Sequence, residues 1–172
     1  MRLLFELDKK DHAACTHSFV RDSARSIIIR DGKIAMLRSE KTGCYEVPGG
    51  GIEAGETPEE AMARETLEEA GLIVIPASVR EYGCVHRVQK APWDETERFI
   101  QDNYYYLCEA EAPAAPQTPD GYVAQEGCVL EFVDPSDAIR RNRGAGEGFS
   151  EPMVLEREAR VLELLIAEGY FD

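Results

Sequence analysis

The sequence predicts an α/β fold in which helices cover a mixed β-sheet. Three observations support this class: β-rich and helical runs are interleaved, an Asp31-Gly32 pair joins two β-rich runs, and residues 56–71 and 151–169 have helical spacing. Such elements bury their apolar sides against one another as layers, so we expect an α/β/α sandwich. No linker or internal repeat divides the 172 residues, and a single domain over 1–172 is expected.

The first part of the chain predicts strands. Residues Arg2 to Asp8 alternate loosely, so the segment 1–20 could add a strand to the sheet or form part of a dimer contact. The run "SIIIRDGKIAMLRS", residues 26–39, predicts a hairpin, because both positions of a two-residue Asp-Gly turn need positive φ. The following "VPGGGIEAGE", residues 47–56, contains three consecutive glycines, which favour neither helix nor strand and suit a close approach to a ligand.

A well-delimited helix is predicted after this glycine-rich segment. Thr57 is a suitable N-cap, Pro58 fits the first helical position, and Glu60 completes a capping box. Gly71 stands where a left-handed C-cap ends the helix. The stripe expected to pack on the sheet consists of Met62, Ala63, Thr66, Leu67 and Ala70.

The second half of the chain continues the alternation of strands and helices. The expected elements are a β-rich run at 72–88 broken at Pro76, a polar loop at 91–97, a strand at 98–111, a Pro-rich connection at 112–121, a strand at 128–134, a short helix from Asp134-Pro135, a flexible loop at 141–148 and a final helix capped by Ser150. The final helix is amphipathic, and its apolar side contains Leu155, Ala159, Leu162 and Ile166.

Composition narrows the classes of partner. The formal net charge is -14, and an acidic surface repels phosphate backbones and anionic lipid, so we expect neither nucleic acid nor a membrane as partner. A small phosphorylated ligand remains compatible with this negative charge if a divalent cation lies between the ligand and the protein. The five cysteines are scattered without CxxC spacing, which favours free, mostly buried thiols in a reducing compartment, the cytoplasm. No apolar run approaches ~18 residues, so no transmembrane helix is expected.

Three glutamates gather on one face of the helix at 56–71. Glu65, Glu68 and Glu69 are offset by three and four residues, and like charges at this spacing destabilise a helix by roughly 0.2–0.5 kcal/mol. Arg64 can pair with Glu60 and Glu68, but one arginine does not neutralise three glutamates. Hard divalent cations such as Mg²⁺ bind all-oxygen sites of this kind. The alternative is a solvated acidic face, which would not need the preceding glycine-rich loop.

Loop and helix together carry a recognisable motif. Gly50, five residues, Glu56, seven residues and then "RETLEEAGL" at 64–72 resemble the Nudix box, except that Thr66 replaces a bulky apolar residue. The preceding hairpin, the later strands and the final helix are also similar to the Nudix fold. The resemblance therefore implies a Nudix-like α/β/α sandwich with a mixed β-sheet.

The resemblance also implies a chemistry. Nudix enzymes are hydrolases that split the P–O–P bond of nucleoside diphosphates linked to another group, with Mg²⁺ or Mn²⁺. Carried over by position, the metal ligands are Glu65, Glu68 and Glu69, with Glu56 supporting the metal site and the backbone C=O of Gly49 or Gly50 reaching it. Arg64 matches the arginine that orients a box glutamate.

A carboxylate is expected to orient or deprotonate the attacking water. Within the box the candidates are Glu68 and Glu69. The best later candidate is Glu126, in a Glu-Gly pair before an apolar strand, although an ordinary surface role fits it equally well; Glu97 is a weaker rival.

Substrate signals are sparse. Motifs for coenzyme A and NADH substrates are missing. The position of the proline typical of ADP-ribose enzymes corresponds to the region of Val88 in this sequence, and the nearest proline, Pro92, comes too late. We therefore expect a nucleoside triphosphate or a broad range of nucleotides. Arg25 could hold a phosphate, or form a surface pair, and Trp93 could stack on a base, or pack against its own domain.

Alternatives stay open at this point. One is an ADP-ribose or nucleotide-sugar pyrophosphatase, and another is an enzyme acting on RNA ends, which the acidic balance disfavours. A different class is a regulator that binds nucleotide without cleaving it. The expected partner is a small nucleotide, and the chain could form a homodimer.

Overall fold

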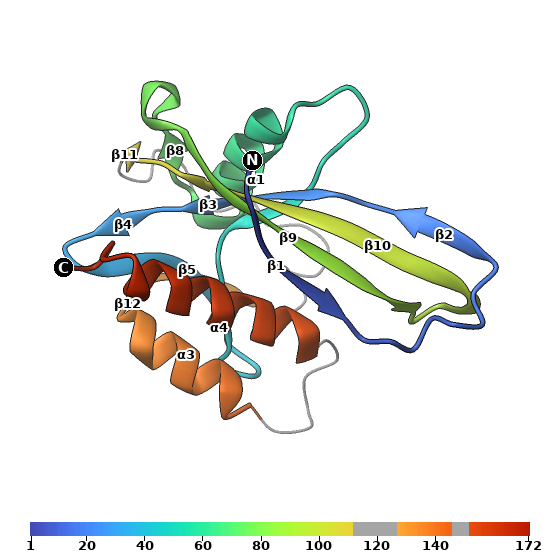
Figure 1. Cartoon of the computed structure of the whole chain (residues 1–172). Coiled ribbons are helices and arrows are strands. Elements are labelled where there is room, and N and C mark those ends of the chain that lie inside the picture. The colour runs from blue at the N-terminus through green and yellow to red at the C-terminus, as the bar shows by residue number, and fades with distance from the viewer. Residues whose placement is uncertain (112–126, 146–151) are drawn as a thin grey trace.

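The computed structural model describes residues 1–111, 127–145 and 152–172 (Figure 1). The Pro-rich connection expected at 112–121, Glu126 and the Ser150 cap lie outside these residues. The strands are β1 (Leu3–Asp8), β2 (His17–Val20), β3 (Ser23–Ile27), β4 (Ile29–Arg30), β5 (Lys33–Ser39), β6 (Tyr45–Glu46), β7 (Gly49–Gly51), β8 (Ile73–Val74), β9 (Arg80–Ala91), β10 (Asp94–Leu107), β11 (Ala110–Glu111) and β12 (Cys128–Val133). The helices are α1 (Pro58–Ala70), the 3-10 turn η1 (Pro76–Ser78), α3 (Pro135–Arg143) and α4 (Pro152–Ala167).

These strands form two main sheets, of which the larger is mixed and the smaller is antiparallel. The larger sheet has the order β1-β9-β10-β3-β7, with β2 also paired to β10, and it combines parallel and antiparallel neighbours. The smaller sheet has the order β12-β5-β4, with β6 also paired to β5. A short β11-β8 pair stands beside them. The predicted α/β class with a mixed sheet is confirmed.

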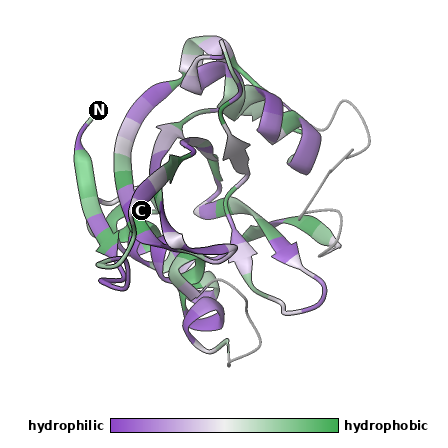
Figure 2. Cartoon of the chain, turned by 90° about the vertical axis from the view of Figure 1, so that its right-hand side faces the viewer, coloured by the Kyte–Doolittle hydropathy of each residue, from purple (hydrophilic) through white to green (hydrophobic). Residues whose placement is uncertain are grey.

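Helices lie on both sides of the sheets, with α1 on one side and α3 and α4 on the other (Figure 1). Strand β5 shows why two cores result. Ala35 and Leu37 pack in the cluster with Met62 of α1, whereas Ile34 and Met36 pack in the cluster with Leu162 of α4. Hydrophobic and hydrophilic residues alternate along several strands (Figure 2), as the period of two requires. The chain is therefore a sandwich with an apolar core on each side of the sheets.

The Asp31-Gly32 hairpin forms as predicted, with φ of 51° and 70° at the two turn positions. The polar loop expected at 91–97 is wrong, because β9 runs to Ala91 and β10 begins at Asp94. Strand β2 pairs in parallel with Glu97–Ile100 of β10 and so adds a third strand beside the β9–β10 hairpin. That pairing joins segments far apart in sequence, so local polarity does not reveal it.

The glycine triplet also differs from expectation, since Gly49–Gly51 form strand β7 against β3. Only glycine fits there: φ at Gly49 is 146°, and a Cβ would lie 2.3 Å from the carbonyl oxygen of Ala24. The triplet is therefore a strand without side chains, which other parts of the protein approach closely.

Three smaller expectations are corrected. Residues 141–143 belong to α3, whose last turn carries arginines that suit the negative end of a helix dipole. Leu67 is 42% exposed and Ile166 is 40% exposed, so both lie at the edge of their helices' apolar stripes. Ala61 is buried in the α1 stripe instead. Within the described residues, no helix is long and apolar enough to cross a membrane.

Candidate active site

Helix α1 begins and ends at residues that fix its register. Thr57 Oγ1 accepts from the Glu60 N–H at 3.2 Å, and Glu60 Oε2 accepts from the Thr57 N–H at 2.8 Å, which completes the predicted capping box. Gly71 has φ 66° and donates its N–H to the Leu67 carbonyl. Thr66 fits the buried face because its hydroxyl hydrogen-bonds the Met62 carbonyl at 2.7 Å. The box glutamates are thereby held at defined positions.

Arg64 gathers the carboxylates around one guanidinium. It binds Glu56 bidentately, with Nε–Oε1 at 2.8 Å and Nη2–Oε2 at 3.0 Å. Nη1 lies 2.7 Å from Glu65 and 3.5 Å from Glu68, and Nη2 donates to the Gly51 carbonyl. The hydrogen bonds from Arg64 lower the pKa of Glu56 to about 2. The expected Arg64–Glu60 pair does not form, because Glu60 is engaged in the capping box.

Two box glutamates press against the glycine strand β7. A Cβ at Gly50 would lie 2.5 Å from the carboxylate carbon of Glu65, so only glycine leaves room for this carboxylate. Glu69 accepts a hydrogen bond from the Gly49 N–H at 2.9 Å. Glu69 is 8% exposed, and burial raises its pKa to about 8 even though this N–H and Arg25 favour the ionised form. A buried carboxylate of this kind is stabilised by a nearby cation.

The donors fit a hard divalent cation in kind. Carboxylate and backbone carbonyl oxygens are the ligands that Mg²⁺ and Mn²⁺ prefer. Within residues 1–111, 127–145 and 152–172, however, no three acidic, histidine or cysteine side chains converge closely enough to enclose a metal ion. Glu56, Glu65 and Glu68 are instead each paired with the guanidinium of Arg64.

A pocket of about 490 Å³ is lined in part by Arg21 and Arg25, whose side chains lie next to Gly51 and Gly49 of β7. We call it the arginine pocket, and its defining residues are Arg21, Arg25, Arg87, Arg157, Trp93 and Phe99. Arg25 is only 9% exposed and donates to the Val47 carbonyl at 3.2 Å, so it is not a surface ion pair. The structure therefore brings Arg25 and Trp93 into one pocket that adjoins Gly49.

Trp93 packs against its own domain, one of the two roles considered for it, and its ring remains largely exposed. Its ring packs edge-on against Phe19 and Phe99, with centroids 5.6 and 5.7 Å away, yet the side chain is 60% exposed. Its Nε1 donates to Glu97 Oε2 at 2.6 Å. Glu97 is thus engaged on the β9–β10 hairpin with Trp93 and, at 3.4 Å, with His17.

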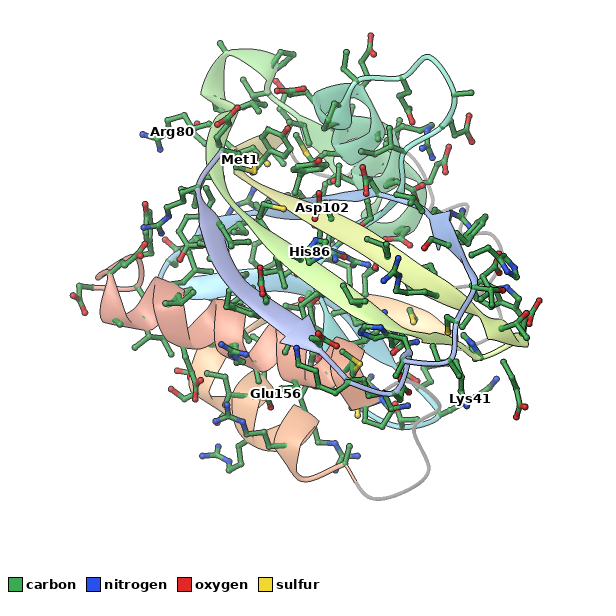
Figure 3. The ribbon with its side chains drawn as sticks, turned by 45° about the vertical axis from the view of Figure 1, so that its right-hand side comes forward. Met1, Lys41, Arg80, His86, Asp102 and Glu156 are labelled. Carbon is green, nitrogen blue, oxygen red and sulfur yellow. The ribbon has the colours of Figure 1, made fainter. Side chains whose placement is uncertain are left out.

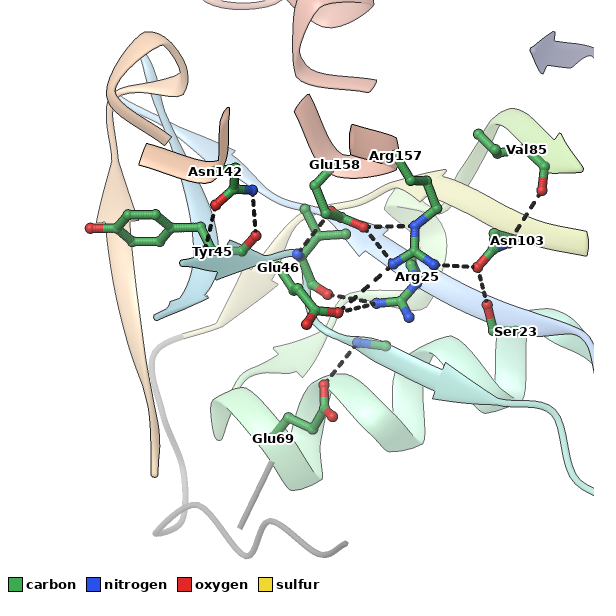
Figure 4. Close-up of polar contacts among 12 residues, drawn as sticks. Ser23, Arg25, Tyr45, Glu46, Glu69, Val85, Asn103, Asn142, Arg157 and Glu158 are labelled. Carbon is green, nitrogen blue, oxygen red and sulfur yellow. Dashed lines mark hydrogen bonds and ion pairs between the residues drawn. The ribbon is translucent and has the colours of Figure 1, made fainter. Parts of the chain in front are cut away.

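A buried network behind the site was missed from the sequence (Figure 4). Arg157 and Glu158 of α4 are 1% and 0% exposed and bind each other at 2.7 Å. Glu158 Oε2 also accepts from the Val47 N–H, and Asn103 accepts from Arg157. The network therefore anchors the segment that leads into β7. A signal existed: Glu158 stands three residues after Leu155 and four before Leu162, on the apolar stripe.

Comparison with known proteins tests the resemblance that the motif implies. A family model of the NUDIX domain matches residues 20–154, which is more than half of the chain. The chain belongs to the Nudix family. Residues 50–72, which carry its box, lie within this match and run from β7 through α1 to Leu72.

Individual relatives of this Nudix chain match over shorter stretches. An ADP-ribose pyrophosphatase from Methanocaldococcus jannaschii is 37% identical over 75 residues, 42% of this chain and 43% of that protein. An RNA pyrophosphohydrolase from Alkalilimnicola ehrlichii is 45% identical over 53 residues, 31% and 28% of the two chains. The chain thus spans less than half the length of these curated relatives. A solved Nudix hydrolase from Nitrosomonas europaea has a TM-score of 0.57 at 18% identity, covering 83% of this chain and 90% of that one, which shows the fold.

Proposed function

We propose that this Nudix chain is a metal-dependent pyrophosphohydrolase that cleaves the P–O–P bond of a nucleoside diphosphate linked to another group. The observation that carries the proposal is the meeting of α1 with β7, where Glu65 lies against Gly50 and Glu69 accepts the Gly49 N–H. Carboxylates beside a backbone without side chains suit a diphosphate held through a cation.

In this proposal Glu65, Glu68 and Glu69 hold Mg²⁺ or Mn²⁺, with the backbone carbonyl of Gly49 or Gly50 in reach. When bound, such a cation neutralises the diphosphate and lowers the pKa of coordinated water. Arg64 keeps the carboxylates oriented, because its five donors fix several oxygens at once. Glu68 has the most exposed carboxylate of the three, at 36%, and together with Glu69 is the candidate to orient the attacking water. Glu126 is the other candidate to orient this water, and it lies outside the described residues.

A nucleoside triphosphate or a broad range of nucleotides is the preferred substrate class. The wall formed by Trp93 offers aromatic surface on which a base can stack. The Methanocaldococcus jannaschii relative favours ADP-ribose as a second candidate, and the Alkalilimnicola ehrlichii relative favours RNA ends. The net charge of -14 disfavours a long nucleic acid.

A substrate panel tests the proposal. Formation of the monophosphate products would be followed chromatographically with Mg²⁺ or Mn²⁺ for nucleoside triphosphates, ADP-ribose, nucleotide sugars and a short triphosphorylated RNA. We expect turnover of one class, reduced about 100-fold or more in Glu68→Gln. Glu59→Gln is the matched control, since Glu59 is exposed on the first turn of the same helix and should retain full activity. Tight nucleotide binding without turnover of any substrate would instead support a non-catalytic regulator.

A further inference from the structure

One side chain of the arginine pocket is a nearly buried glutamine. Gln89 lies on β9, lines the pocket and is only 6% exposed. A glutamine amide has one carbonyl acceptor and two N–H donors, and within the part of the chain that the structure describes this amide makes no hydrogen bond. Because buried polar groups in proteins are nearly always hydrogen-bonded, an amide of this kind at a pocket wall is available to a ligand.

The register of the β9–β10 hairpin places Gln89 beside the aromatic wall of the pocket. Gln89 is the cross-strand partner of Phe99, and directly opposite residues of antiparallel strands have their side chains on the same face of the sheet. Phe99 packs edge-on against Trp93, with ring centroids 5.7 Å apart. The Gln89 side chain therefore lies next to the surface that the proposed function gives to the stacked base.

An aromatic surface beside a neutral amide suits a nucleobase. The flat face of a base stacks on an aromatic ring, and its edge carries donors and acceptors that a glutamine amide pairs with through two hydrogen bonds. A phosphate offers acceptors alone, so it leaves the carbonyl of the amide unmatched. A ribose hydroxyl is the rival partner, because it both donates and accepts, and the experiment below includes it.

We propose that Gln89 is a specificity-determining residue, which hydrogen-bonds the edge of the substrate's base while the face of the base stacks on Trp93. The common bases differ in the order of donors and acceptors along their edges, so an amide held among buried neighbours accepts some bases and rejects others. This inference rests on the proposed pyrophosphohydrolase function and deepens it, since it makes the base a recognised part of the substrate.

Binding without cleavage tests this role. AMP, GMP, CMP and UMP would be titrated calorimetrically into the whole chain with Mg²⁺, beside ribose 5-phosphate, which has no base. We expect the best monophosphate to bind about tenfold or more tightly than the worst one and than ribose 5-phosphate. In Gln89→Leu, the best monophosphate should bind about tenfold more weakly, so that the preference among bases is lost. Lys90→Gln is the control, because the next residue of a strand faces the other side of the sheet, and its preference should stay unchanged.

Stability separates recognition from a structural role. Leucine is close to glutamine in size, and replacing Gln89 removes no side-chain hydrogen bond between described residues. We therefore expect Gln89→Leu to unfold at the same urea concentration as the wild type or at a higher one. A lower midpoint, together with equally weakened binding of all four monophosphates and ribose 5-phosphate, would show that Gln89 supports the fold and would overturn the inference.

The outcomes also separate this inference from the function on which it rests. A preference among bases that is lost in Gln89→Leu supports the role of Gln89 even if no substrate is cleaved, in which case only the proposed function fails. If no monophosphate binds more tightly than ribose 5-phosphate, or if Gln89→Leu keeps the preference of the wild type, the inference is overturned. Turnover of nucleotides with the same preference in both proteins would overturn it as well and would leave the proposed function standing.

Discussion

At the scale of single residues, one side chain organises the candidate site. Arg64 contacts Glu56, Glu65, Glu68 and the Gly51 carbonyl, each from a different direction within one planar group. A lysine has a point charge and cannot bind several oxygens in this fixed geometry. The arrangement of the carboxylates therefore depends on the shape of the guanidinium as well as on its charge.

Arg64→Lys separates shape from charge. We expect kcat/KM to fall about tenfold or more, because the bidentate contact with Glu56 and the contact with Gly51 cannot both be kept. Formation of the nucleoside monophosphate with Mg²⁺ measures this, and Arg80→Lys is the exposed control. Wild-type activity in Arg64→Lys would show that charge alone suffices.

Gly50→Ala tests the contact between β7 and Glu65. The added Cβ would meet the end of a flexible side chain, so the Glu65 carboxylate moves and activity falls while the fold persists. Gly55→Ala is a contrasting control: its φ of +86° costs about 1 kcal/mol of strain, but nothing lies within 4 Å of the new Cβ. We expect Gly55→Ala to lower the free energy of unfolding and to keep its kcat. If Gly50→Ala keeps its activity instead, the role given to Gly50 is contradicted.

The reactivity of two cysteine thiols tests their burial in the folded protein. Burial raises the pKa of Cys84 to about 11 and that of Cys108 to about 12. A raised pKa favours the neutral thiol, so both should react slowly with an aromatic disulfide reagent at pH 8 and quickly once urea unfolds the chain. Mass spectrometry of the labelled peptides gives the rates. Fast labelling of Cys108 in the folded protein would show that its side of the core is open.

At the scale of elements, α4 supports the site from behind. Its Arg157–Glu158 pair connects the Val47 N–H, Asn103 and Tyr105, so it joins the final helix to β10 and to the segment before β7. Breaking a buried pair leaves an uncompensated charge, which is costlier than losing a surface pair. The position of β7 therefore depends on a helix that contributes none of the box glutamates.

Glu158→Gln measures this support. Loss of one partner of a buried pair should lower the free energy of unfolding by about 3–5 kcal/mol. Glu156→Gln is the neighbouring control, since the Glu156 side chain (labelled in Figure 3) is 45% exposed in a surface pair with Arg143 of α3, and surface pairs contribute about 0–1 kcal/mol. Urea unfolding of both variants measures this free energy. Equal destabilisation of the two variants would contradict the supporting role given to the buried network.

At the scale of the whole molecule, local signals were predictable and non-local pairings were not. The capped helix and the Asp31-Gly32 turn rely on neighbours within four residues, and both appear where the sequence places them. Strand β7 depends on pairing with β3, and the long β9–β10 hairpin is bordered by β2, which no local pattern announces. The positions of the box glutamates follow from the capped helix, whereas the arginine pocket brings together residues from 21 to 157 along the chain.

The central claim is that the box glutamates work through a divalent cation. The most direct measurement is turnover of a nucleoside triphosphate by the whole chain in EDTA and after addition of Mg²⁺, with Glu68→Gln in parallel. The account predicts no turnover in EDTA, full recovery with Mg²⁺, and a loss of about 100-fold or more in the variant even at saturating Mg²⁺. Turnover that persists in EDTA, or that is unchanged in Glu68→Gln, would contradict it.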